Sequence, residues 1–150
     1  IFLGDAGAFL IGHFLVWVSI GLLHDTPDLN PFAILLVFFW PVADTFLAVW
    51  RRRATGRRPD QPDRLHFHQL AVRYLEIRHF GRGRRGLLNP LTTAILLPFI
   101  VAPQIVGVMF ATSTWVPEAA TVMFGLFYMG AYVLVIRGSK RGARQQSRLA

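Results

Sequence analysis

The chain of 150 residues contains no cysteine, and its basic residues are absent from four long apolar runs. The lack of cysteine excludes disulfides and thiolate metal sites. Eleven of the sixteen Lys and Arg residues lie between Arg51 and Arg85, and the other five lie between Arg137 and Arg148. A soluble protein scatters its charge over its whole surface, so this segregation is typical of an integral membrane protein.

Each apolar run is long enough to cross a bilayer, which takes about 20 residues at a rise of about 1.5 Å each. We predict an all-α, polytopic membrane protein that forms a single membrane domain. Pro41 and Asp44 interrupt the second run, and Pro98 and Pro103 are expected to kink the third. The four predicted spans are residues 6–23, 31–50, 87–110 and 119–136.

Charge predicts the orientation of these spans, because cytoplasmic segments carry an excess of Lys and Arg. The loop 51–86 and the tail 137–150 hold all the basic residues, so both are expected in the cytoplasm. The two short turns between spans contain acidic residues and no basic one, so they are expected outside. Asp5 then lies on the cytoplasmic face with the basic loop. Topology and anionic lipid headgroups account for the positive charge, and no nucleic-acid partner is expected.

A helix with two different faces is predicted within the basic loop, from Asp63 to Phe80. At 3.6 residues per turn, apolar and polar side chains fall on opposite faces of this segment. Asp63 is expected to cap its N-terminus. We predict an amphipathic helix that lies on or just under the membrane surface. Its apolar face comprises Phe67, Leu70, Ala71 and Tyr74, and its polar face comprises His66, Gln69, Arg73 and Glu76.

Asp5 lies in the sequence Phe2-Leu3-Gly4-Asp5-Ala6-Gly7, directly before the first span. A carboxylate at a helix N-terminus beside glycines can hold Mg²⁺ close to phosphate groups. The alternative is a structural role, in which Asp5 caps the helix and the glycines permit close packing. Physical chemistry alone leaves both interpretations open.

Asp44 lies inside the second span, where a carboxylate is costly and often has a function. The alternative is again structural, with Asp44 bonding a neighbouring helix or the backbone freed by Pro41. Arg51, Arg52 and Arg53 end this span. They are expected to anchor it to lipid phosphates.

His66 and His68 are two residues apart and follow Asp63 and Arg64. Two histidines are too few for a zinc site. Phosphate binding is better supported, because the arginine, the histidines and a helix N-terminus all favour an anion. The alternative is an interfacial helix whose histidines are merely solvated.

Three stretches of this chain, taken together, carry a family resemblance. They are Phe2-Leu3-Gly4-Asp5-Ala6-Gly7 with Gly12 behind it, Pro41-Val42-Ala43-Asp44-Thr45 leading to Arg51-Arg52-Arg53, and Pro62-Asp63-Arg64-Leu65-His66-Phe67-His68-Gln69-Leu70. In their order, spacing and shared predicted side of the membrane they resemble the polyprenyl-phosphate N-acetylhexosamine-1-phosphate transferases (glycosyltransferase family 4). The resemblance covers residues 1 to about 75, and the last two spans fit the family's C-terminal helices.

The resemblance implies a reaction in the bacterial inner membrane, at a site that faces the cytoplasm. A polyprenyl phosphate attacks the β-phosphate of a UDP-linked N-acetylhexosamine, so that a polyprenyl-pyrophosphoryl sugar forms and UMP leaves. The product serves cell-envelope polysaccharide biosynthesis. Mg²⁺, with Mn²⁺ as a substitute, neutralises the pyrophosphate charge.

The resemblance also assigns residues. Asp5 matches the catalytic or metal-binding aspartate of the family. The nucleotide-sugar would be bound by Asp63, Arg64, His66 and His68. Asp44 matches a motif aspartate to which no role is assigned. The Asp-Arg pair ahead of the histidines favours the N-acetylglucosamine branch of the family over the muramoyl-pentapeptide branch.

The chain departs from the family pattern in two ways. Members usually carry a further His where this chain has Gln69, which can form hydrogen bonds but carries no charge. They also carry a pair of adjacent aspartates on an earlier cytoplasmic loop, and no such pair occurs here. Because the chain also begins with Ile1, we expect it to be the C-terminal part of a longer transferase or an incomplete gene product. Such a chain would hold only half of the active site, so we expect the isolated chain to be inactive. The alternative is a non-catalytic four-helix membrane protein that binds anionic lipid or a partner through its basic loop.

Overall fold

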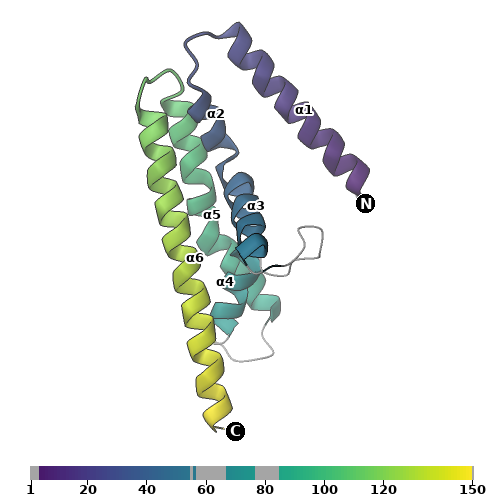
Figure 1. The fold of residues 1–150 in the computed structure, drawn as a ribbon, viewed down its shortest axis with the longest axis vertical. Helices are drawn as coiled ribbons and strands as arrows, with labels where there is room; N and C mark the ends of the chain where they lie inside the picture. The colour runs from purple at the N-terminus through teal and green to yellow at the C-terminus, as the bar shows by residue number, and fades with distance from the viewer. Residues whose placement is uncertain (1–3, 55, 57–66, 77–84, 150) are drawn as a thin grey trace.

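The computed structural model describes residues 4–54, 56, 67–76 and 85–149, without the side chains of 54, 85 and 139–149. All regular structure in these residues is α-helical (Figure 1). The helices are α1 (Gly4–Asp25), α2 (Pro31–Val37), α3 (Phe39–Ala54), α4 (Phe67–Leu75), α5 (Arg85–Met109) and α6 (Val116–Leu149).

Three of these helices are long and apolar enough to cross a membrane, namely residues 4–25, 86–109 and 116–138. The bent pair α2 and α3 makes a fourth if the two are counted as one span. The all-helical, membrane-spanning fold class is therefore confirmed. Helix α6 runs without interruption from Val116 to Leu149, so it continues beyond both ends of the predicted span 119–136 and makes the described part of the basic tail helical.

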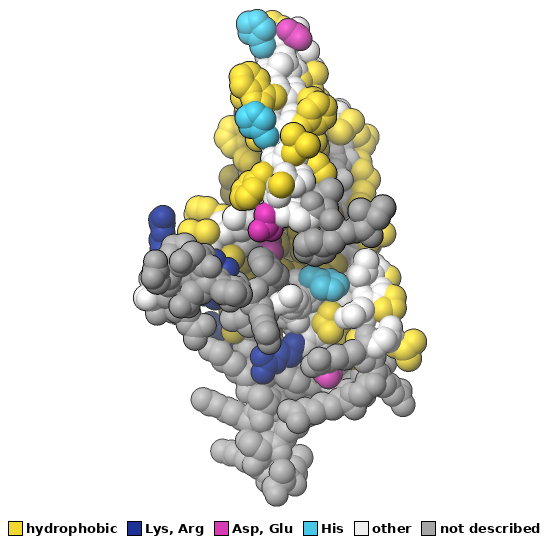
Figure 2. All heavy atoms as spheres, turned by 90° about the vertical axis from the view of Figure 1, so that its right-hand side faces the viewer, with side chains coloured by type: hydrophobic (Ala, Val, Ile, Leu, Met, Phe, Trp, Pro, Cys, Tyr) yellow, Lys and Arg dark blue, Asp and Glu magenta, His cyan; other side chains and the backbone are white. Residues whose placement is uncertain are grey.

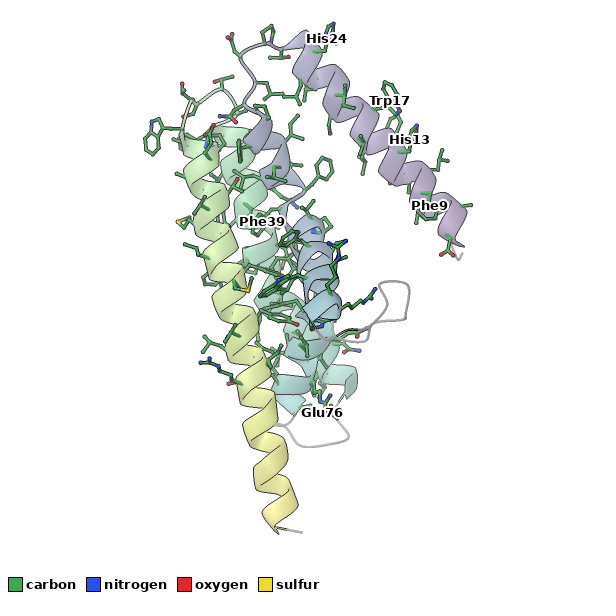
Figure 3. The ribbon with its side chains drawn as sticks, in the orientation of Figure 1. Phe9, His13, Trp17, His24, Phe39 and Glu76 are labelled. Atoms are coloured by element: carbon green, nitrogen blue, oxygen red, sulfur yellow. The ribbon has the colours of Figure 1, made fainter. Side chains whose placement is uncertain are left out.

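Helix α1 is apolar on all sides and stands away from the other helices (Figure 1). None of its residues is buried, and Phe9 and Trp17 are 79% and 61% exposed. Figure 2 shows hydrophobic side chains on the surface along this part of the molecule. Two polar side chains of α1 bond to each other within the helix: the indole N–H of Trp17 donates to Nε2 of His13 at 2.9 Å (Figure 3). A helix that is hydrophobic all round belongs in lipid or against other helices.

The second predicted span is broken, at a position that the sequence pattern missed. Helices α2 and α3 meet at an angle of 81°, and the break falls at Phe38 and not at Pro41 or Asp44. Pro41 does not break the helix because it lies in the first turn of α3, where its missing N–H needs no partner within the helix. Helix α2 has its own N-cap, since the side chain of Asn30 accepts the N–H of Phe32 at 2.9 Å.

The helices α2, α5 and α6 form a bundle, and α4 lies against α5 and α6. Gly107 of α5 permits a close approach of α2, because a Cβ atom there would lie 2.7 Å from the carbonyl oxygen of Ala33. Phe39 points into the bundle (Figure 3). The buried core consists of Leu36, Phe39, Leu47, Phe67, Leu70, Ala71, Leu96, Ala120, Tyr128 and Tyr132.

Asn30 joins the two short turns at the end of the bundle opposite α4. Its backbone N–H donates to the carbonyl of Ala111 at 2.8 Å. Its side-chain amide donates to the carbonyl of Ser113 and to Oε1 of Glu118, both at 2.9 Å. One buried residue therefore holds the start of α2 against the start of α6.

Candidate functional site

The candidate site is built around α4, the described part of the amphipathic helix predicted from Asp63 to Phe80. Phe67, Leu70 and Ala71 are buried, as the apolar face requires. Of the predicted polar face, Gln69 and Arg73 are exposed. The helix is seated on α5 and α6, so its apolar face is covered by protein.

Glu76 corrects one detail of the predicted polar face. It was expected on the solvent side, but it is only 8% exposed (Figure 3). Glu76 lies in a π-helical turn directly after Leu75, and the wider turn changes the register that the α-helical pattern assumed. The predicted cap Asp63 and the predicted site residues Arg64 and His66 lie outside the described residues.

Asp44 links α3 to both α4 and α6. Its Oδ1 accepts the backbone N–H of Phe67 at 3.1 Å and the hydroxyl of Tyr128 at 2.9 Å. Phe67 is the first residue of α4 that the structure describes, and its N–H donates to this carboxylate. The structural alternative for Asp44, a bond to a neighbouring element, is thus the one that the geometry supports.

An aromatic cluster surrounds this hydrogen-bonded carboxylate. The ring of Phe67 lies 5.3 Å from that of Trp40 and 5.1 Å from that of Tyr128, measured between centroids. Tyr132 stacks on Phe67 from one turn further along α6, at 6.4 Å. Arg51 donates to the Tyr132 hydroxyl, and its guanidinium carbon lies 5.9 Å from the centre of that ring. These contacts combine burial with a cation–π interaction.

The arginines that end α3 divide between this cluster and the surface. Arg51 was expected to anchor the span to lipid, but it is half-buried and bonded to α6. Arg52 is also half-buried, and Arg53 is exposed. The three lie in the last turn of α3, where cations interact favourably with the helix dipole.

His68 and Gln69 are exposed on α4, directly after the buried Phe67. Their side chains are therefore available to a ligand while the helix that carries them is held by its first residue. Of the three sequence stretches, the structure brings the one with Asp44 into contact with the one that contains Phe67 and His68.

Asp5 is exposed in the first turn of α1, and Figure 1 shows that end of α1 apart from α3 and α4. Gly4 precedes it with a φ of 66°, a left-handed conformation that favours glycine. Within the part of the chain that the structure describes, no three His, Cys, Asp or Glu side chains are placed to hold a metal ion. In their described residues, the first stretch is thus not joined to the other two.

Comparison with curated proteins gives three relatives with the same name, undecaprenyl-phosphate alpha-N-acetylglucosaminyl 1-phosphate transferase. The chain is 29% identical to that of Pasteurella multocida over 99% of its own length. It is 30% identical to that of Yersinia pestis and 28% identical to that of Escherichia coli K12, each over 96% of its length. The chain is a relative of these transferases.

The resemblance predicted from the three stretches is therefore confirmed. The chain spans 41%, 37% and 36% of the length of these three transferases. No protein-family model matches it, and no significant match to a solved structure is found.

The aromatic residues of α6 that hold this transferase-like site were not found by the sequence reasoning. Tyr128 and Tyr132 are four residues apart, so they share one face of a helix. Two tyrosines at that spacing in an apolar span are a usable signal, because a buried hydroxyl needs a partner. The partners themselves, Asp44 and Arg51, are more than eighty residues away in sequence, at separations of 84 and 81.

Proposed function

We propose that this chain belongs to an enzyme that transfers N-acetylhexosamine-1-phosphate from a UDP-sugar to a polyprenyl phosphate. The supporting observation is the contact between Asp44 and the first residue of α4. This contact brings together the stretch with Asp44 and the stretch with His68. From the sequence alone, each of these stretches could be compared with the transferases, but their contact could not be seen. The names of the relatives support N-acetylglucosamine as the sugar and undecaprenyl phosphate as the acceptor.

The donor would bind at the exposed face of α4. His68, Gln69 and Arg73 are exposed there, and each side chain can donate a hydrogen bond to a phosphate oxygen. The arginines at the end of α3 add positive charge nearby, and Figure 2 shows the described Arg side chains below the apolar upper part of the molecule. A cationic surface of this kind attracts an anionic nucleotide-sugar.

Asp5 would supply one carboxylate ligand to Mg²⁺. It fits in part, since it is exposed at the start of a helix, and Mg²⁺ commonly takes one or two protein carboxylates together with substrate phosphates. The described residues provide no further ligands for a three-residue set, so the remaining carboxylates would come from elsewhere in the longer protein. When bound, the ion would neutralise charge on the pyrophosphate of the donor.

The acceptor is a membrane lipid, which would bring its phosphate to the cytoplasmic surface of the bacterial inner membrane. An oxygen of that phosphate would attack the β-phosphorus of the donor. The bond between the β-phosphorus and the bridging oxygen would break, and UMP would leave with that oxygen. The part of His68 would be to hold donor phosphate oxygens in line for this displacement.

The full-length protein that contains this chain tests the proposal. In membranes, with UDP-N-acetylglucosamine and undecaprenyl phosphate, it is expected to release UMP and form the lipid-linked pyrophosphoryl sugar. The 150-residue chain alone is expected to release none, because its set of carboxylates is incomplete. Absence of activity in the full-length protein, when it is correctly inserted, would contradict the proposal.

A non-catalytic role is the second candidate. The observation that favours it is the lack of a three-residue metal group among the described positions. In that case the full-length protein would be inactive, and its basic segment would still bind vesicles that contain anionic lipid.

A further inference from the structure

We infer that Asp44 is a positioning residue that holds α4 at Phe67 and thereby sets the place of His68. The inference rests on the proposed function for its catalytic consequence, but its structural part can be measured without activity. Asp44 accepts hydrogen bonds from the backbone of Phe67 and from the hydroxyl of Tyr128. It acts through the backbone of the residue that precedes His68.

The first step is a hydrogen bond to α4 from a distant element. Most backbone N–H groups of a helix donate to a carbonyl of the same helix. Here the N–H of Phe67 donates to Asp44, which lies 23 residues earlier on α3. Because Phe67 is 4% exposed, water cannot readily replace this acceptor.

The second step is the anchoring of the carboxylate itself. The hydroxyl of Tyr128 donates to the same Oδ1 that accepts the Phe67 N–H. Tyr128 is 4% exposed and lies on α6, so Asp44 ties three helices together at one oxygen. The ring of Phe67 is held in turn between Trp40 and the tyrosines of α6.

The third step leads to His68. It follows Phe67 on α4 and is exposed, while Phe67 is buried. Loss of the Asp44 carboxylate would leave the first turn of α4 free to shift or fray. A misplacement of about 1 Å at a substrate-binding group can lower the rate of a positioned reaction by about 100-fold.

Hydrogen exchange on the full-length protein tests the structural part. In Asp44→Ala, the backbone amides of residues 67–75 are expected to exchange at least 10-fold faster than in the wild type, while those of α5 are unchanged. Asp44→Asn keeps a carbonyl acceptor and is expected to exchange like the wild type. Thr45→Ala, at the exposed neighbour on α3, is the matched control. Unchanged exchange of α4 in Asp44→Ala would overturn the inference.

A double-mutant cycle tests the catalytic part. Asp44→Ala and His68→Ala are each expected to raise the KM for UDP-N-acetylglucosamine about 10-fold, and the double variant no more than the larger single effect. If the KM of the double variant instead rises by the product of the two single increases, Asp44 acts independently of His68, which contradicts the inference. If Asp44→Ala fails to accumulate, Tyr128→Phe replaces it in the double-mutant cycle with His68→Ala. This variant keeps the aromatic ring and removes the hydroxyl that donates to Asp44. An inactive wild type would refute the proposed function, and the exchange result would still decide the role of Asp44.

Discussion

Gly107 offers the sharpest test of how α2 is seated in the bundle. It is buried on α5, and a Cβ atom there would lie 2.7 Å from the carbonyl oxygen of Ala33 and 3.0 Å from the Cβ of Leu36. The nearer of these neighbours is a backbone atom, which cannot rotate away. Gly107→Ala therefore forces α2 and α5 apart.

The expected size follows from two opposing terms. Alanine is favoured over glycine inside a helix by roughly 0.5–1 kcal/mol. Overpacking of a close-packed contact costs about 1–3 kcal/mol. A Cβ atom added at Gly130 on α6 would meet nothing within 4 Å. Gly130→Ala should therefore gain the helix preference of alanine without any cost from overpacking. The two variants should differ in free energy of unfolding by about 1–3 kcal/mol, with Gly107→Ala the less stable.

Equilibrium unfolding of the protein in mixed detergent micelles, followed by circular dichroism, measures this difference. Gly125→Ala serves as a second control, because its surroundings are also open. If Gly107→Ala were as stable as Gly130→Ala, α2 would not lie against α5 as described, and the reasoning about the broken span would be wrong.

Four further outcomes are expected. Asn30→Ala should lower the free energy of unfolding by about 1–3 kcal/mol, because it leaves buried partners unpaired; an effect equal to that of the exposed Asn89→Ala would contradict this. Thr114→Cys should react with an impermeant thiol reagent from outside, and labelling only from the cytoplasm would refute the predicted orientation. In the full-length protein, Asp5→Asn should lower turnover by about 100-fold or more, whereas Asp25→Asn at the other end of α1 should not. Chelation of divalent cations should abolish activity, and Mg²⁺ or Mn²⁺ should restore it; full activity after chelation would exclude the proposed metal.

The apolar runs predicted most of the helices because a long uncharged segment has few alternatives to a helix in a membrane. The break at Phe38 could not be predicted in this way. No Gly or Pro marks that position, and the proline three residues later is accommodated in a first turn. The break coincides with the burial of Leu36 and Phe39 on either side of it, so tertiary packing overrides the local pattern.

The candidate residues of α3 and α4 could be named from the sequence, but Tyr128, Tyr132 and the contacts between the helices could not. Periodicity correctly placed Phe67 inside and Gln69 outside α4. It could not show that Asp44 bonds to α4, since that bond joins elements far apart in sequence. The roles of Asp63, Arg64 and His66 remain predictions.

The bend between α2 and α3 also decides whether the chain crosses the membrane an even or an odd number of times. In the described residues, three unbroken helices are long and apolar enough to cross the membrane, and the bent pair either adds a fourth crossing or returns to the side it came from. With an even number, the first residue of α1 and the last of α6 lie in the same compartment, and so do Asp5 and the basic loop. With an odd number, the loop and the tail would still share a compartment, because the two crossings of α5 and α6 separate them, and Asp5 would lie on the opposite side of the membrane. A single bent helix pair therefore determines whether the carboxylate on α1 can share a compartment with His68.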